Sequence, residues 1–222
     1  MKMSGSSKKN IRNLIIAPLI CFVAVCAALL VVLAPTIKDA VSIGTMFISD
    51  KQMDYSGDYE NIFVPTDKKG DTVNAEDVEF PTINKQFGEL AVESCDVQAK
   101  LFFGDGKIPL KNGVGIYAGS FVPGYGKTIL VAGHNNTYFN GLKNIKKGDV
   151  VSVRTSWGNY KYKVKETKVL DAQDKKAIDL NADKETLVMY TCYPFDEIGL
   201  TSKRFFVYAD KISGPEIVGL YG

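Results

Sequence analysis

Histidine and cysteine are scarce in this chain of 222 residues, which holds one histidine and four cysteines. The single histidine, His134, excludes any zinc site that needs two histidine ligands. Cys21 and Cys26 lie in an apolar run near the N-terminus, so only Cys95 and Cys192 remain for the rest of the chain. Small secreted domains stapled by disulfides carry more cysteines in fewer residues, so the sequence does not fit that class.

The chain also lacks a strong excess of either charge, since its formal net charge is +2. Proteins built to grip nucleic acid usually show a marked basic excess, so we expect no nucleic-acid partner. Hydrophobic residues make up 45% of the chain, which favours a packed core over disorder. The length allows one ordinary domain with additional segments.

One long stretch lacks charge altogether. Leu14–Ala34 is an uncharged apolar run of 21 residues, and a bilayer-crossing helix needs about 20. Lysines and one arginine precede the run without any acidic residue, and positive charge favours the cytoplasmic side. We therefore predict a cytoplasmic tail at 1–13, a single membrane anchor at 14–34 and an extracellular remainder. A cleaved signal peptide is the competing interpretation, although its apolar core is usually shorter. A buried core helix is the other, although the run has no polar face.

After the anchor, residues 35–77 are polar and mixed, which predicts an extracellular linker or stalk. From residue 78 to 222, short β-branched and aromatic runs recur between turn-forming residues, which is typical of an all-β barrel or sandwich. The predicted strands are 128–132, 149–154, 159–164, 185–190 and 204–209, with a hairpin turn at Gly158 and a helical turn at 138–145.

Three residues at predicted strand ends could perform chemistry together. His134 follows an apolar strand, Cys192 follows "TLVMYT", and Arg204 opens the next strand. Each has an ordinary alternative: a surface histidine, an inert buried thiol and a solvated arginine. Together they offer a base, a nucleophile and a fixed fork of donors for an oxyanion, provided that antiparallel pairing of the two last strands returns Arg204 to the cysteine. Papain-type proteases have the opposite order, with the cysteine before the histidine.

These segments resemble the sortase family. "GVGIYAGSFVPGYGKTILVAGH" (113–134) is similar to the segment that leads to the sortase histidine, and "TLVMYTC" (186–192) is similar to the TLxTC signature, with a different spacing before the Thr-Cys pair. "KRFFVYA" (203–209) matches the strand that begins with the sortase arginine. The combination looks most like class D sortases, over about 78–212.

The resemblance implies an eight-stranded β-barrel with short helices, in a membrane-anchored cysteine transpeptidase of Gram-positive bacteria. Such an enzyme cuts an LPxTG-like sorting signal of a surface protein and joins the new carboxyl end to a cell-wall amine. It implies that Cys192 is the nucleophile, His134 the general acid/base and Arg204 the oxyanion donor. Thr191 and Tyr193 are expected at the substrate.

The resemblance requires no metal or other cofactor, and we predict none. Asp171, Asp174, Asp179 and Asp183 lie where some sortases bind calcium, but acidic loop residues are usually only solvated. Cys95 is expected in the core. Two alternatives stay open: a non-catalytic anchored binding module, and another cell-wall cysteine transpeptidase. An L,D-transpeptidase would place its histidine close before the cysteine, whereas His134 lies 58 residues upstream of Cys192.

Overall fold

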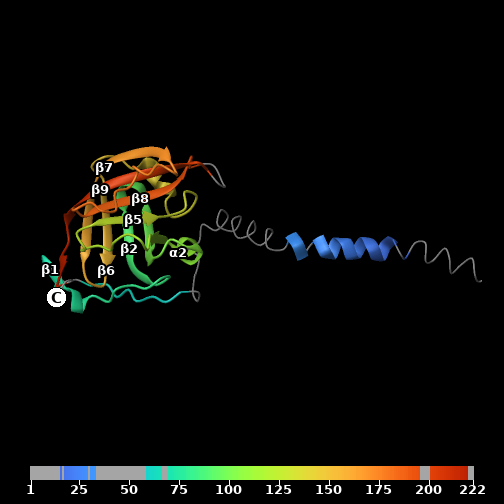
Figure 1. Ribbon diagram of the computed structural model, residues 1–222, viewed down its shortest axis with the longest axis horizontal. Coiled ribbons are helices and arrows are strands. Elements are labelled where there is room, and N and C mark those ends of the chain that lie inside the picture. Colours follow the sequence, from blue (N-terminus) through green and yellow to red (C-terminus); the bar gives the residue numbers. More distant parts are fainter. Residues whose placement is uncertain are drawn as a thin grey trace, which may run out of the picture. The chain divides into compact units, whose positions relative to one another are not determined.

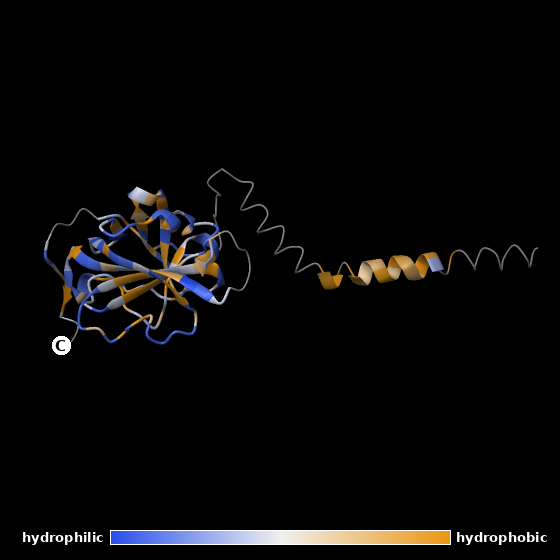
Figure 2. Cartoon of the chain, turned by 90° about the horizontal axis from the view of Figure 1, so that it is seen from above, coloured by the Kyte–Doolittle hydropathy of each residue, from blue (hydrophilic) through white to orange (hydrophobic). Residues whose placement is uncertain are grey.

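The computed structural model describes residues 16, 18–29, 31–33, 59–66, 70–195 and 201–219. The chain divides into two compact units, Met1–Asp54 and Tyr55–Gly222. In the first unit the described residues 16, 18–29 and 31–33 are helical, and Figure 2 shows most of them at the hydrophobic end of its scale. Within the described ranges, no helix is both long enough and apolar enough to span a bilayer. Residues 14, 15, 17, 30 and 34 of the predicted anchor lie outside those ranges.

The second unit is a closed β-barrel of eight strands in the order β2-β3-β4-β5-β8-β9-β7-β6 (Figure 1). The strands are β2 (Gln86–Val92), β3 (Val97–Phe103), β4 (Val114–Ile116), β5 (Thr128–Ala132), β6 (Val150–Thr155), β7 (Asn159–Asp171), β8 (Thr186–Tyr193) and β9 (Lys203–Ser213). Short helices lie between them: η2 (Glu93–Cys95), α2 (Lys107–Asn112) and η3 (Asn140–Asn144). The mainly β fold, with eight barrel strands and few short helices, confirms the predicted fold class.

Two of the neighbouring pairs in the barrel are parallel, β3 with β4 and β5 with β8, and the other pairs are antiparallel. The parallel pairing of β5 and β8 brings the carboxyl ends of both strands to the same rim. Because β9 runs antiparallel to β8, its amino end reaches that rim too. Residues at the ends of three strands therefore meet at one place.

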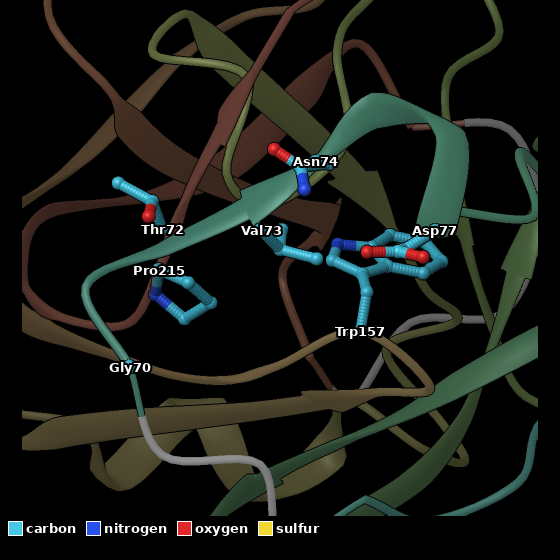
Figure 3. Close-up of a pocket in the computed structure, with 7 residues that line it drawn as sticks. All are labelled: Gly70, Thr72, Val73, Asn74, Asp77, Trp157 and Pro215. Carbon is cyan, nitrogen blue, oxygen red and sulfur yellow. The ribbon is translucent and has the colours of Figure 1, made fainter.

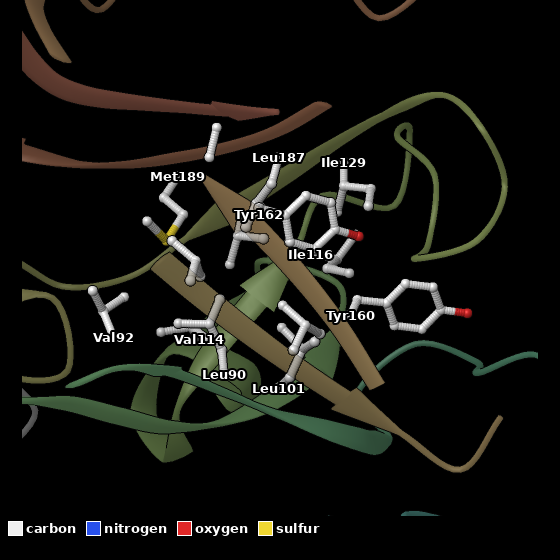
Figure 4. Packing of buried hydrophobic residues seen from close by; sticks show 14 of the residues in the cluster. Leu90, Val92, Leu101, Val114, Ile116, Ile129, Tyr160, Tyr162, Leu187 and Met189 are labelled. Atoms are coloured by element: carbon white, nitrogen blue, oxygen red, sulfur yellow. The ribbon is translucent and has the colours of Figure 1, made fainter. Parts of the chain in front are cut away.

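The barrel interior is filled by one side of every strand. Along β7, residues 159–165 alternate between exposed and buried, as the period of two in a pleated strand requires. Tyr162, Leu187 and Met189 point into the same cluster as Leu90 and Val114 (Figure 4). The interior is closed at the hairpin between β6 and β7 by Trp157, whose ring stacks on Phe87 with centroids 5.7 Å apart. Burial of these aromatic side chains fixes the strand register from inside.

A second, smaller apolar cluster lies on the outer face of β5, β8 and β9. It comprises Leu130, Val188 and Phe206 from the three strands and Ala177 from the segment between β7 and β8. Tyr190 packs against this cluster from β8. The segment 172–185 therefore covers part of the outer face, next to the rim where the three strands meet.

A buried carboxylate holds several segments of the barrel together at the start of β8. Glu185 is 5% exposed and accepts hydrogen bonds from the backbone N–H groups of Gly124 and Gly126, at 3.1 and 3.0 Å. The Tyr162 hydroxyl donates to it at 2.7 Å, and the Lys211 ammonium lies 3.5 Å away. Burying a carboxylate is tolerated here because it is paired and hydrogen-bonded.

The five predicted strands are all present, and the predicted turn at Gly158 joins β6 to β7. β7 and β9 are longer than predicted, and η3 (Asn140–Asn144) lies in the predicted helical turn. The strands β2, β3 and β4 were not predicted from the sequence, because their apolar residues are mixed with charged and small ones.

The domain also begins earlier than residue 78. Residues 72–74, within the predicted linker of 35–77, form strand β1 (Thr72–Asn74), which pairs in parallel with β10 (Glu216–Val218). The 3-10 helix η1 (Ala75–Asp77) follows it. Val73 and Ile62 pack on the main core. The structured part of this segment therefore belongs to the barrel unit, because its apolar side chains find partners there that a linker composition does not reveal.

Candidate active site

Cys192 and Arg204 face each other across the β8–β9 pair. Their Cα atoms are register partners in the antiparallel ladder, one residue before the ladder ends at Tyr193 and Lys203. Cys192 lies two residues after Tyr190, which packs on the outer cluster. The side chains of Cys192 and Tyr190 therefore both point to the outer face of the barrel. Cys192 and Arg204 are both half-buried. The predicted return of Arg204 to the cysteine by antiparallel pairing is therefore confirmed.

His134 reaches the same rim from β5. In the parallel pair, Ala132 is the partner of Tyr190, and the N–H of Gly133 continues the ladder by donating to the Tyr190 carbonyl at 3.3 Å. Two residues further along each strand, the same register leads from Ala132 to His134 and from Tyr190 to Cys192. The imidazole is exposed, and partial desolvation by the surrounding protein lowers the pKa of His134 below its ordinary value of 6.5.

Two hydrogen bonds tie the residues beside His134 to the residues beside Cys192. The Thr191 hydroxyl donates to the carbonyl of Gly133 at 2.7 Å, and Thr191 is only 2% exposed. The Asn135 side-chain amide donates to the carbonyl of Pro194 at 2.9 Å, and Asn135 is 7% exposed. Each bond joins a neighbour of the histidine to a segment next to the cysteine. The two segments are thus held in a fixed relation on both sides of the histidine.

The loop that carries His134 is also closed on itself. The His134 carbonyl accepts the N–H of Phe139 at 3.1 Å, and the Asn140 side-chain amide donates to the Asn135 carbonyl at 2.8 Å. Phe139 is fully buried, and its ring lies so close to Gly133 that any side chain at that position would collide with it. The absence of a side chain at Gly133 therefore allows the loop to fold tightly behind the histidine.

The guanidinium of Arg204 is held by the backbone that precedes β9. Its Nη1 donates to the carbonyls of Thr201 and Lys203, at 2.7 and 2.9 Å. All the hydrogen bonds that Arg204 makes to the described residues come from this one nitrogen. The fork of an arginine has donors on three nitrogens, and Nε and Nη2 make no hydrogen bond to any residue that the structure describes.

The arrangement offers a thiol, an imidazole and a guanidinium on one rim of the barrel, from three different strands. Such a set can form and break an acyl–sulfur bond: the thiolate attacks a carbonyl, the imidazole moves the proton and the cation faces the oxyanion. The sequence pattern pointed to these three residues but not to Asn135, although the place of Asn135 directly after the histidine was a usable signal.

The two residues predicted to contact substrate occupy different surroundings. Tyr193 is half-buried, packs against the core and approaches Phe195 edge to face with ring centroids 6.2 Å apart. The hydroxyl of Thr191 faces inward and is already bonded to Gly133. Because β8 alternates, this side chain lies on the opposite side of the strand from Cys192. The expected contact of Thr191 with substrate stays a prediction.

The four aspartates that could suggest a calcium loop mostly serve the loop itself. Asp171, Asp174 and Asp179 each accept the backbone N–H two residues later, at 2.8, 2.9 and 3.0 Å. Asp183 pairs with Lys127 at 2.7 Å, and the Lys127 ammonium lowers its pKa. Across the described part of the chain, no three acidic, cysteine or histidine side chains gather in a way that could hold a metal ion.

Two further features lie away from this rim. Cys95 is 6% exposed and, as expected, part of the core; burial raises the pKa of its thiol. A cleft of about 290 Å³ lies between β1, Pro215 and the β6–β7 hairpin (Figure 3). It is lined by Gly70, Thr72, Val73, Asn74, Asp77, Trp157 and Pro215. The indole N–H already donates to the carbonyl of Pro123 at 3.0 Å, and the lining has no thiol or imidazole, so the chemistry of the rim has no counterpart there.

Comparison with known proteins identifies the family. A family model of the sortase domain matches residues 90–212. Sortase D of Bacillus subtilis (strain 168) is 30% identical over 133 residues, which are 60% of this chain and 67% of that protein. The structure of Listeria monocytogenes sortase A superposes with a TM-score of 0.52 at 28% identity, covering 60% of this chain and 92% of that one.

The fold is also shared at lower identity. A Clostridium perfringens sortase D5 transpeptidase superposes with a TM-score of 0.54 at 21% identity, covering 60% of this chain and 83% of that one. Fold, rim geometry and family match all agree. The chain therefore belongs to the sortase family of cysteine transpeptidases and resembles its class D members.

Proposed function

We propose that this protein is a membrane-anchored sortase that cleaves an LPxTG-like signal of a surface protein and transfers the protein to a cell-wall amine. The observation that carries the proposal is the meeting of Cys192, Arg204 and His134 at one rim. Cys192 and Arg204 are register partners, and the ladder of β5 with β8 leads to His134. Family membership supports the reaction class.

In the first half-reaction, the Cys192 thiolate attacks the carbonyl carbon of the threonine in the signal. A carbon–sulfur bond forms, and the negative charge moves to the carbonyl oxygen. When the intermediate collapses, the C–N bond to the next residue breaks, and His134 gives its proton to the departing amine. The products are an acyl thioester on Cys192 and the released tail of the signal.

In the second half-reaction, a primary amine attacks the thioester. A new C–N bond forms, the C–S bond breaks, and the proton lost by the amine passes to the imidazole of His134. The thiolate of Cys192 is restored. The same histidine thus acts as acid in one step and as base in the other, which suits a group whose pKa lies near or below neutrality.

Arg204 stabilises the oxyanion of both tetrahedral intermediates. Its position opposite Cys192 supports this role, because the charge develops within one strand spacing of the sulfur. The bonds from Nη1 to the Thr201 and Lys203 carbonyls hold the guanidinium without occupying Nε or Nη2. A prepositioned donor needs little rearrangement when the charge appears.

Binding of the signal involves the outer face near Cys192 and the flanking loops. Thr191 contributes by holding Gly133, and its backbone lies next to the nucleophile. Tyr193 lies one residue beyond the nucleophile, and its ring packs toward Phe195, so its part in substrate binding stays a prediction. The segment 172–185 covers part of this face. Residues 196–200 of the loop after β8 lie outside the described ranges.

Membrane attachment is proposed from the apolar run at 14–34 and the basic residues before it. The N-terminus would then lie in the cytoplasm and the barrel outside the cell. This placement gives the barrel access to secreted surface proteins and to cell-wall precursors, the two partners that the reaction needs.

The test is a quenched fluorescent peptide that carries an LPxTG-like signal, incubated with the full chain in detergent. Cleavage between threonine and glycine, its loss in Cys192→Ala, and appearance of the threonine carboxyl end on an added amine would establish the transpeptidase. A folded protein that cleaves no peptide of a broad panel would favour the non-catalytic binding module instead.

A further inference from the structure

A second row of residues crosses the outer face beside the rim. Gly115 of β4 pairs with Ala132 of β5, and Ala132 pairs with Tyr190 of β8. The row lies two residues before His134 on β5 and before Cys192 on β8, about 7 Å along the strands. Gly115 has no side chain and Ala132 has only a methyl group, so Tyr190 is the one large side chain among these three register partners.

Asp105 lies directly over this row. The chain leaves β3 through Gly104 and Asp105 and crosses Gly115 so closely that a methyl group there would collide with the Gly104 carbonyl oxygen. The same methyl group would lie 3.1 Å from the Cα of Asp105. The missing side chain of Gly115 thus allows the backbone of Asp105 to rest on the sheet. A carboxylate is thereby placed on the face that carries Cys192.

Tyr190 reaches toward this carboxylate. Its hydroxyl lies 3.5 Å from Oδ2 of Asp105, and its ring stacks on Phe206 with centroids 5.8 Å apart. Burial, and then the Asp105 charge, raises the pKa of Tyr190 to about 12, so the hydroxyl keeps its proton near neutral pH. Tyr190 lies two residues before Cys192 on the same face of β8, so it adjoins the candidate nucleophile.

The contacts of Asp105 within the barrel do not explain why this position carries a charged side chain. Asp105 is half-buried, and no lysine or arginine among the described residues forms an ion pair with it. Attack on the peptide carbonyl in the first half-reaction involves no cationic group of the substrate that this carboxylate could bind. The second half-reaction, in contrast, needs a primary amine, which is largely a cation near neutral pH.

We propose that Asp105, supported by the Tyr190 hydroxyl, binds the ammonium group of the incoming acceptor next to the thioester on Cys192. This inference rests on the proposed transpeptidase function and assigns the acceptor its site. The carboxylate raises the local concentration of the ammonium ion. The bound ammonium loses one proton to solvent, and the neutral amine attacks the thioester carbonyl. As the C–N bond forms and the C–S bond breaks, the second proton passes to His134 and the Cys192 thiolate leaves. Asp105 itself neither gains nor loses a proton over the cycle.

The experiment compares two acceptors on the full chain in detergent, with a cleavable signal peptide as donor. Glycinamide is largely an ammonium ion near neutral pH, whereas hydroxylamine is largely neutral. We expect Asp105→Asn to raise the KM for glycinamide about two- to fivefold, the range for a partly exposed charge pair. The KM for hydroxylamine and the rate of acylation should stay unchanged. Added salt should shrink the difference between wild type and variant.

Two further variants serve as controls. Tyr190→Phe keeps the ring and removes the hydroxyl, and we expect a smaller rise in the KM for glycinamide. Asp96→Asn removes an exposed carboxylate just before β3, about 20 Å from Asp105 at the other end of that strand, and should leave both acceptors unaffected. Asparagine suits the left-handed backbone of Asp96, whose φ is 53°.

Three results would overturn the inference, and each would identify a different reason for its failure. Equal effects of Asp105→Asn on both acceptors would show that charge is not recognised. A changed KM for the peptide, with the acceptors unaffected, would place Asp105 at the sorting signal. If wild type formed neither hydroxamate nor glycinamide product from any peptide, the proposed function would fail, and the acceptor site with it.

Discussion

The side-chain amide of Asn135 donates a hydrogen bond to the carbonyl of Pro194 at 2.9 Å, which joins the residue after the histidine to the segment after the cysteine. Together with the bond from Thr191 to Gly133, it fixes His134 relative to Cys192 from both sides. The side-chain donors of Asn135 and Thr191 in these two bonds are directed at other segments of the protein. Both act as positioning residues, and this role separates their expected effects from those of the reacting groups.

Replacement of Asn135 by alanine should therefore impair the reaction more than the binding of peptide. Small misplacement of a catalytic group can reduce a rate about 100-fold, so we expect kcat to fall about 10- to 100-fold. The KM for the signal peptide should change little. Steady-state kinetics with Asn136→Ala as the matched control checks this. Equal losses in both variants would contradict a specific role for Asn135.

Thr191 offers a test of the buried hydrogen bond through stability. Thr191→Val keeps the shape but leaves the Gly133 carbonyl without its donor, which should lower the free energy of unfolding by about 1–3 kcal/mol. Thr191→Ser keeps the donor and should lose less. Urea denaturation of both variants gives the comparison. If serine and valine were equally destabilising, the hydroxyl would not be the stabilising group.

Arg204→Ala should reduce kcat about 100- to 1000-fold, the effect of removing one oxyanion donor. Lys203→Ala is the matched control, because Lys203 is exposed and is the register partner of Tyr193 rather than of Cys192. Single-turnover measurement of acylation isolates the step concerned. A large effect of Lys203→Ala alone would move the role to the neighbouring cation.

His134 can be titrated without overlap, because the chain has no other histidine. Desolvation lowers its pKa in the folded state, so the unfolded chain binds the proton more tightly, and stability should fall as the pH drops below about 6.5. The ring signals in an NMR titration should show a midpoint below 6.5. If the midpoint lay above 6.5 in the wild type and decreased in Cys192→Ala, it would instead reveal an ion pair between His134 and the thiolate.

Glu185 should matter for stability and not for chemistry. Glu185→Ala breaks a buried network that includes Tyr162 and Lys211, and loss of one partner in such a network costs about 3–5 kcal/mol. The residue precedes β8 at the end opposite to Cys192, about 23 Å along the strand. Urea denaturation beside kcat of the folded fraction separates the two effects.

The sequence by itself determined the strands of the second half and pointed to the three candidate catalytic residues, whose roles stay predictions. The alternation in 159–164 and the apolar runs before His134 and Cys192 are local signals, because a strand with one buried face must repeat every two residues. The scarcity of histidine and cysteine also left few candidates for a nucleophile and a base. The resemblance to sortases at 186–192 and 203–209 then supplied the reaction class.

Only the tertiary structure decided which residues surround that set. β2, β3 and β4 could not be located locally, since their burial depends on partners far along the chain. The parallel pairing of β5 with β8 puts Asn135 within reach of Pro194, and the glycine at position 115 lets Asp105 approach Tyr190. These contacts link residues 59 and 85 positions apart. Pairing and close approach at such separations arise from closure of the barrel, which no local pattern of the sequence records.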